Sequence, residues 1–274
     1  MPTGLYYCRT QNFGDALNPL IFERVLGVPV HYAKKRRAEL CGIGSILDGL
    51  VASPAILNML TRACLPPIHV FSSGFTFPSQ KPEARPIRKM VVHAVRGKRT
   101  RQQLIDLGVL AAEQPVAYGD AGLFAPFLLT RDVPKKYFCG VIPHVAEKDC
   151  AEVGALAKAI HGSVVIDFEQ PPLKVLEQMA ACEVIVSSAM HGLIVADALG
   201  TPNIWMKVSD RIIGGRHKFD DYYSAYADYT KEPIAVYDVA RSFSQCSCPV
   251  AATREALQDG LRQALSGWLD TRKG

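Results

Sequence analysis

Short apolar runs of β type alternate with segments of helical length between residues 138 and 206. Strands are predicted at 138–143, 164–168, 184–188 and 203–206, and helices at 151–160, 173–182 and 192–199. Because these strands are apolar along their whole length, they are typical of a parallel sheet that is covered by helices on both faces. The pattern therefore predicts a doubly wound α/β domain.

The first half of the chain shows the same alternation. Strands are predicted at 4–8, 28–32, 39–43, 69–72 and 90–95, and helices at 15–26 and 100–107. Pro126 and Pro134 flank a polar segment, 125–136, that is typical of a linker. We expect two Rossmann-like domains, 1–130 and 131–250, that face each other across a cleft, and a helix in 251–274 that packs back on the first. In such folds ligands bind at the carboxyl ends of the strands.

The composition sets limits on the function. With 49% hydrophobic and 21% charged residues, the 274-residue chain has the composition of a folded globular protein. It has no uninterrupted apolar stretch long enough to cross a membrane and begins without the pattern of a secretion signal, so we expect a cytoplasmic protein. The net charge of +5 suits an anionic substrate or an acidic membrane surface better than a nucleic acid. The eight cysteines lack CxxC spacing, and we predict no metal site.

Three loops place small or polar residues between a predicted strand and a helix, at 11–15, 42–45 and 187–192. Helix N-termini present free N–H groups and a partial positive charge, so these loops are candidate anion sites. None of them contains a nucleotide-binding fingerprint. The glycines at 42 and 44 are equally explained by a tight turn, and Asp15 by the capping of a helix.

His191 lies between a buried strand and an apolar helix, where packing alone favours an aliphatic residue. Its titration range suits proton transfer. A buried histidine that is hydrogen-bonded to its own loop explains the pattern equally well.

Further charged residues follow other predicted strands. Arg96, Arg99 and Arg101 suit the recognition of carboxylate or phosphate, although a solvated basic turn gives the same pattern. Asp120 could orient a histidine, bind a sugar hydroxyl or cap a turn. Glycines 214 and 215 precede a charged and aromatic cluster, which fits a mobile loop over a polar ligand or an ordinary loop between domains. The basic run 34–37 is assigned no function.

Seven segments, taken in order, resemble the polysaccharide pyruvyl transferase family, which includes the ketal-pyruvate transferases of bacterial exopolysaccharide assembly. The segments are NFGDALNPL (12–20), GIGSIL (42–47), VRGKRTRQQLIDLG (95–108), YGDAGLFAP (118–126), IPH (142–144), SSAMHGLIVADALGTP (187–202) and KFDDYY (218–223). The resemblance implies a fold similar to that of GT-B glycosyltransferases. It also implies transfer of the enolpyruvyl group of phosphoenolpyruvate to two hydroxyls of a sugar, as a cyclic ketal.

The resemblance also implies the roles of individual residues. His191 would be the general acid, with Asp120 and Arg96 completing the catalytic set. The residues expected to bind substrate are Asn12, Gly14, Asp15, Gly44, Ser45, Arg99, Arg101, His144, Ser188, Gly192 (through its backbone N–H), Lys218 (reaching over when the cleft closes) and Asp221. No cofactor is expected besides phosphoenolpyruvate as donor substrate.

The acceptor implied by the resemblance is the sugar end of a lipid-linked oligosaccharide, met by peripheral contact with the inner face of the cell membrane. One departure concerns the anion site: Ala189 stands where some relatives have arginine, and Met190 where leucine is usual. The sequence leaves two alternatives open. One is a glycosyltransferase of similar fold that uses a nucleotide sugar, and the other is an inactive sugar-binding relative.

Overall fold

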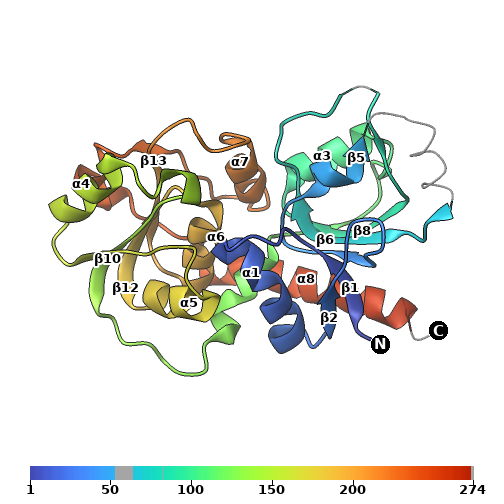
Figure 1. The fold of residues 1–274 in the computed structure, drawn as a ribbon, viewed down its shortest axis with the longest axis horizontal. Coiled ribbons are helices and arrows are strands. Elements are labelled where there is room, and N and C mark those ends of the chain that lie inside the picture. Colours follow the sequence, from blue (N-terminus) through green and yellow to red (C-terminus); the bar gives the residue numbers. More distant parts are fainter. Residues whose placement is uncertain (53–63, 82, 273–274) are drawn as a thin grey trace.

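Two parallel sheets, each flanked by helices, organise the molecule into two lobes (Figure 1). The computed structural model describes residues 1–52, 64–81 and 83–272. This arrangement confirms the predicted α/β class with two Rossmann-like units. The finer prediction, a GT-B-like arrangement, remains a prediction.

The first sheet has the strand order β2-β1-β3-β6-β8-β9, with β4 beside β6. Its strands are β1 (Thr3–Tyr6), β2 (Val30–Tyr32), β3 (Leu40–Cys41), β4 (Gly44–Ser45), β6 (Ile68–Gly74), β8 (Met90–Val95) and β9 (Ala117–Tyr118). The strand predicted at 39–43 is shortened to β3, and a second short strand, β4, follows two residues later; both pair with β6. Gly44, which begins β4, has a φ of 128°, which is open to glycine but rarely to other residues. A small antiparallel pair, β5 (Val51–Ala52) and β7 (Arg85–Pro86), lies outside this sheet.

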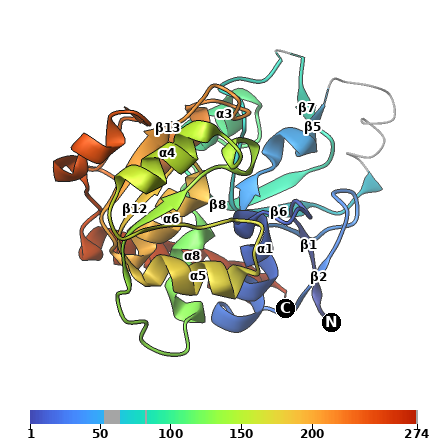
Figure 2. The ribbon, with the colours of Figure 1, turned by 60° about the vertical axis from the view of Figure 1, so that its left-hand side comes forward.

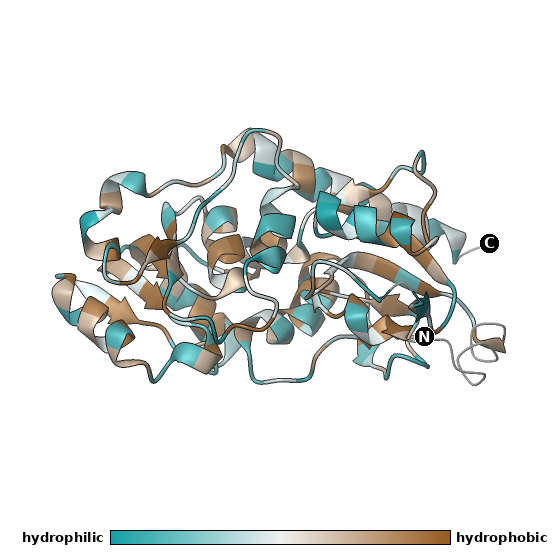
Figure 3. Ribbon diagram, turned by 90° about the horizontal axis from the view of Figure 1, so that it is seen from above, coloured by the Kyte–Doolittle hydropathy of each residue, from teal (hydrophilic) through white to brown (hydrophobic). Residues whose placement is uncertain are grey.

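The second sheet has the order β11-β10-β12-β13-β14, all parallel. Its strands are β10 (Tyr137–Ile142), β11 (Ser163–Val165), β12 (Cys182–Ser187), β13 (Asn203–Lys207) and β14 (Ile234–Ala235). Helices α4 (Ala151–Ala159) and α5 (Pro172–Ala180) contribute to different apolar clusters, and they lie on opposite faces of the sheet (Figure 2). Because the sheet is covered on both faces, its strands are apolar along their whole length, as the sequence shows. Figure 3 shows these strands in brown between helices whose outer faces are hydrophilic.

The remaining helices connect and cover the two sheets. They are α1 (Phe13–Leu20), which continues as the π-helix η1 (Ile21–Val25), α3 (Lys98–Asp106), α6 (Met190–Leu199), α7 (His217–Tyr223) and α8 (Ala251–Thr271). Short 3₁₀ helices are η2 (Leu47–Leu50), η3 (Ala121–Leu128), η4 (Val145–Glu147), η5 (Val239–Arg241) and η6 (Phe243–Gln245). Helix α8 packs on β8 and β9 of the first sheet, and Trp268 is buried there. No helix in these described stretches is long and apolar enough to cross a membrane.

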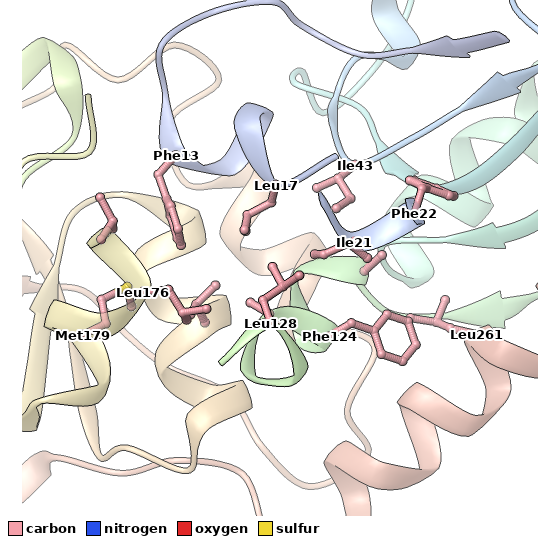
Figure 4. Close-up of a cluster of buried hydrophobic side chains, with 14 of the residues drawn as sticks. Phe13, Leu17, Ile21, Phe22, Ile43, Phe124, Leu128, Leu176, Met179 and Leu261 are labelled. Carbon is pink, nitrogen blue, oxygen red and sulfur yellow. The ribbon is translucent and has the colours of Figure 1, made fainter. Parts of the chain in front are cut away.

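One apolar core is shared by both lobes. Phe13 and Leu17 of α1 belong to the same buried cluster as Leu176 and Met179 of α5 (Figure 4). Phe13 also donates a backbone hydrogen bond of 2.9 Å to the carbonyl of Phe168, in the second lobe. The shared core fixes the two lobes relative to each other, because separating them would expose this apolar surface to water.

Two segments differ from their sequence interpretation. Residues 217–223, predicted as a loop, form helix α7, in which Phe219, Tyr222 and Tyr223 are buried. The loop prediction was wrong here because the aromatic side chains pack into a buried apolar cluster, which stabilises the helix. The predicted linker begins later than residue 125, since η3 extends to Leu128 and buries Phe124.

Candidate active site

Each sheet has one topological switch point, which lies between two neighbouring strands. In the first sheet the order reverses between β1 and β3, and in the second between β10 and β12. At such a switch point the loops that follow the two neighbouring strands run to opposite faces and leave a crevice. The crevices of this chain meet between the lobes, so residues that follow all four strands come together.

A cavity of about 170 Å³ occupies this meeting point. The first lobe lines it with Cys8, Asn12, Asp15, Gly44, Ser45 and Ile46, and the second with His144, Phe168, Ala189, Met190, His191 and Lys218. Seven of the residues predicted from the sequence therefore line one cavity. They are Asn12, Asp15, Gly44, Ser45, His144, His191 and Lys218.

His191 and Asp120 face each other behind the cavity wall. His191 Nε2 lies 3.9 Å from Asp120 Oδ2, beyond hydrogen-bond distance. Both atoms are buried, and neither has a hydrogen-bond partner among the described residues. Buried polar atoms are normally paired. Two unpaired ones at this separation are typical of a catalytic pair that shortens when substrate binds.

Asp120 is held in place from two sides. Its Oδ1 accepts a hydrogen bond of 2.8 Å from Gly122 N, as the N-cap of η3. The flanking backbone is fixed by Ser72, whose Oγ donates to the carbonyl of Gly119 at 2.9 Å and accepts from Ala121 N. Burial raises the pKa of Asp120 to about 6, opposed by the Gly122 N–H. The carboxyl group is thus mainly ionised at neutral pH and can orient the imidazole.

The imidazole of His191 is confined at its other edge by α1. A Cβ atom at position 14 would lie 2.0 Å from His191 Nδ1, so only glycine allows the backbone this close. Gly14 therefore positions the histidine rather than contacting the cavity. Burial lowers the pKa of His191 to about 4, with Asp15 opposing the shift and Arg96 and Lys218 adding to it. The free imidazole is neutral at pH 7.

Asp15 is not the helix cap that the sequence allowed. Asn12 occupies the N-cap, and its Oδ1 accepts a 3.3 Å hydrogen bond from Gly14 N. The Asp15 carboxylate is left to face the cavity, where it accepts a hydrogen bond from Thr10 Oγ1. Burial raises the pKa of Asp15, while the Thr10 hydrogen bond and the charges of His191 and Lys218 lower it.

Lys218 lines the cavity without any movement of the lobes. It is the single lysine or arginine among the described lining residues. Burial lowers the pKa of Lys218 to about 8, with a further contribution from Arg96, while Glu147 and Asp15 oppose the shift. Burial, followed by the charge of Lys218, lowers the pKa of His144 to about 4. The backbone N–H of His144 donates to Ser188 Oγ at 2.9 Å, so Ser188 joins the ends of β10 and β12.

Arg96 and Asp221 form a buried ion pair beside the cavity and do not line it. Arg96 Nε lies 2.9 Å from Asp221 Oδ2, and both side chains are 0% exposed. Arg96 also donates to Ser45 Oγ at 2.5 Å and to the carbonyl of Phe75 at 2.8 Å. Asp221 further accepts from the backbone N–H and the hydroxyl of Thr100, at 2.8 and 2.7 Å. The pair fixes α7, and therefore Lys218, against the first lobe.

Six predicted substrate contacts do not line the cavity: Gly14, Ser188 and Asp221, described above, and Arg99, Arg101 and Gly192. Arg99 forms an ion pair with Asp220 at 3.2 Å, and Arg101 donates to the carbonyls of Ala112 and Gln114. Both side chains lie on α3, which points them away from the switch points. The backbone N–H of Gly192 donates to the carbonyl of Ala189 at 3.0 Å, so it is not free for an anion. A Cβ there would lie 2.2 Å from Ser187 Oγ, so Gly192 allows α6 to pack on β12.

The sequence interpretation did not select Cys8, Ile46 or Phe168, which also line the cavity. Each follows a strand of a switch point or its neighbour, so the rule of carboxyl ends could have found them. No group of three or more histidine, cysteine, aspartate or glutamate side chains that could hold a metal ion occurs within residues 1–52, 64–81 and 83–272.

The sequence matches the family model described as polysaccharide pyruvyl transferase over residues 54–210, more than half of the chain. The chain belongs to this family. It is also 27% identical over 225 residues to the succinoglycan biosynthesis protein ExoV of Rhizobium meliloti (strain 1021), which covers 79% of this chain and 63% of that protein. An uncharacterized protein, L143, of Acanthamoeba polyphaga mimivirus is 30% identical over 139 residues, 49% of this chain and 47% of that protein. The chain thus spans between about half and two thirds of the length of these curated relatives.

Proposed function

We propose that this chain transfers the enolpyruvyl group of phosphoenolpyruvate to two hydroxyls of a saccharide, which forms a pyruvate ketal and releases phosphate. The observation that carries the proposal is the unpaired His191 and Asp120 beside a cavity that both lobes line. Family membership and the similarity to a succinoglycan biosynthesis protein support the choice of reaction.

The first step is protonation of the donor. Phosphoenolpyruvate is the phosphate ester of an enol, and its methylene carbon gains a proton from His191 while the electron pair of the double bond forms the new C–H bond. The neighbouring carbon becomes an oxocarbenium centre. Asp120 stabilises the imidazolium that this step requires and fixes its orientation, since Nε2 faces it. His191 is among the residues that line the cavity, which supports this role.

Two hydroxyls then attack the same carbon in turn. The first forms a C–O bond and loses its proton, and the second displaces phosphate, which leaves with the electron pair of the C–O bond. Asp15 lies in the cavity wall and serves as the acceptor for the hydroxyl protons. Lys218 and the N-terminus of α6 supply positive charge for the phosphate and carboxylate of the donor. We propose no metal or other cofactor.

The acceptor we propose is lipid-linked and is reached by peripheral contact at the inner face of the cell membrane, with the protein otherwise cytoplasmic. The net charge of +5 supports this placement, because anionic lipids attract a positive surface. The identity of the sugar is left open.

The proposal predicts which ligand stabilises the protein. We expect phosphoenolpyruvate to raise the melting temperature, by an amount equivalent to about 2.7 kcal/mol at one hundred times its Kd, and uridine diphosphate to have no effect. The companion assay follows phosphate release with phosphoenolpyruvate and a panel of saccharides, with the ketal product identified by mass spectrometry. Stabilisation by the nucleotide alone would support a glycosyltransferase instead, and saccharide binding without phosphate release would indicate an inactive relative.

A second prediction concerns Lys218 and pH. Because its pKa is lowered to about 8, the ammonium group is lost in the folded protein between pH 8 and 10. Donor binding needs the charged form, so we expect the Kd of phosphoenolpyruvate to rise with pH in this range, by up to about tenfold per unit. The donor phosphate is fully ionised there and does not contribute.

The matched variant is Lys218→Arg, which remains charged across the same range. Calorimetric titration from pH 7 to 10 should show a smaller rise of Kd with pH for Lys218→Arg than for wild type, because only the proton uptake by His191 is left to contribute. An equally steep rise in both proteins would show that another group controls binding.

A further inference from the structure

A basic groove lies next to the cavity, at the carboxyl ends of β1 and β2. We use this name for the groove lined by Arg9, Lys34, Lys35, Arg36 and Arg37. His31, Tyr32 and Ala33 complete its wall. All five cations are exposed. The mechanism proposed above uses none of them.

The charge of the basic groove is not compensated. Within the described part of the chain, none of the five cations forms an ion pair with a carboxylate. Five exposed positive charges without carboxylate partners attract anions.

The turn that carries four of these cations is built rigidly. Arg37 N and Ala38 N both donate to the carbonyl of Lys34, at 2.7 and 3.0 Å. Beneath the turn lies Arg88, only 1% exposed, which donates to the carbonyls of Lys35 and Ala38 at 3.1 and 2.9 Å. Arg88 has no carboxylate partner among the described residues, so it adds a sixth positive charge under the groove. A run of charged residues that is only solvated does not need a turn fixed by a buried arginine beneath it.

The basic groove adjoins the cavity at residues 8 and 9. Cys8 lines the cavity and the next residue, Arg9, lines the groove. The guanidinium of Arg9 lies 4.9 Å from the centre of the Tyr32 ring, which holds it over the end of β2. Arg9 is therefore the cation of the groove that lies next to the cavity along the chain.

We infer that the basic groove binds the phosphate or diphosphate group of the acceptor while its sugar occupies the cavity. The inference rests on the proposed function and extends it, since it requires an acceptor that carries phosphate close to the sugar. Arginine and lysine together favour phosphate, because guanidinium groups bind its oxygens in pairs and ammonium groups add charge. The donor phosphate binds separately, at Lys218.

Calorimetric titration with inorganic pyrophosphate tests the inference without turnover. The groove variant is Lys34→Gln/Arg36→Gln/Arg37→Gln. Its matched control, Lys158→Gln/Lys174→Gln/Arg241→Gln, removes three exposed charges from the second lobe. We expect wild type and control to bind pyrophosphate with and without saturating phosphoenolpyruvate, the groove variant to bind at least tenfold more weakly, and binding to weaken with salt.

The other outcomes overturn the inference. Equal binding by the groove variant would exclude the groove, and displacement of pyrophosphate by phosphoenolpyruvate would place it in the cavity. Sedimentation with phosphatidylcholine vesicles that contain 30% phosphatidylglycerol forms the second arm. Vesicle binding that the groove variant loses, without pyrophosphate binding in wild type, would show a membrane-docking surface instead. Failure of phosphoenolpyruvate to stabilise wild type would reject the proposed function. The comparison of pyrophosphate binding between wild type and the groove variant would still show whether the basic groove binds phosphate groups.

Discussion

Replacing His191 with glutamine should slow ketal formation by about 10²- to 10⁴-fold, the usual contribution of a general acid. Glutamine can hydrogen-bond to Asp120 but cannot deliver a proton to carbon. Donor affinity should change much less, because Lys218 and the N-terminus of α6 remain in place. The measurement is phosphate release under saturating donor, with His161→Gln as the control, since His161 is exposed and outside the cavity.

A second readout separates catalysis from a structural role. The pKa of His191 is lowered to about 4 in the free protein, so the imidazole must gain a proton before it can act as an acid. The charges of the bound donor raise that pKa, and we expect proton uptake when phosphoenolpyruvate binds near pH 7. Calorimetry in buffers of different ionisation enthalpy measures this uptake, which His191→Gln should abolish. Normal turnover by the variant, or unchanged uptake, would remove His191 from the mechanism.

The sequence was informative wherever local chemistry decides the outcome. Continuous apolar runs predicted four of the five strands of the second sheet to within a few residues, missing only the two-residue β14, and β8 extends over the predicted 90–95. The rule that ligands bind at the carboxyl ends of parallel strands also selected Asn12, Asp15, Gly44, Ser45 and His191, all of which line the cavity, whereas His144 was implied only by the family resemblance.

The sequence could not show which charged side chains face the cavity. Arg96, Arg99 and Arg101 share one basic segment, yet Arg96 is buried against Asp221, and the other two lie on the outer side of α3. The orientations of Arg96 and Arg99 depend on contacts with α7, which is 125 residues away from Arg96 at Asp221. The segment of α7 was predicted as a loop because the glycine pair that precedes it favours a loop. Its aromatic side chains stabilise the helix only through packing in the folded second lobe, which the local sequence does not show.

Replacing Asp221 with alanine should lower the free energy of unfolding by about 3–5 kcal/mol, since Arg96 would remain buried without a counter-charge. The contacts of Asp221 with Thr100 would be lost as well. Asp220→Ala is the matched control on the same helix. Its partners Arg99 and Arg216 are 51% and 54% exposed, and such pairs contribute about 0–1 kcal/mol. Denaturation in urea measures both variants.

The double variant Arg96→Met/Asp221→Leu distinguishes an unpaired charge from a general loss of packing. Removing both charges relieves the burial cost of Arg96, so we expect the double variant to recover much of the stability lost by Asp221→Ala. It should still bind phosphoenolpyruvate more weakly than wild type, because the ion pair fixes α7 and thereby positions Lys218. A stability loss for Asp221→Ala no larger than that of Asp220→Ala would show that the shared apolar core alone holds the lobes together. In that case the donor affinity of the double variant should equal that of wild type, and the ion pair would have no part in positioning Lys218.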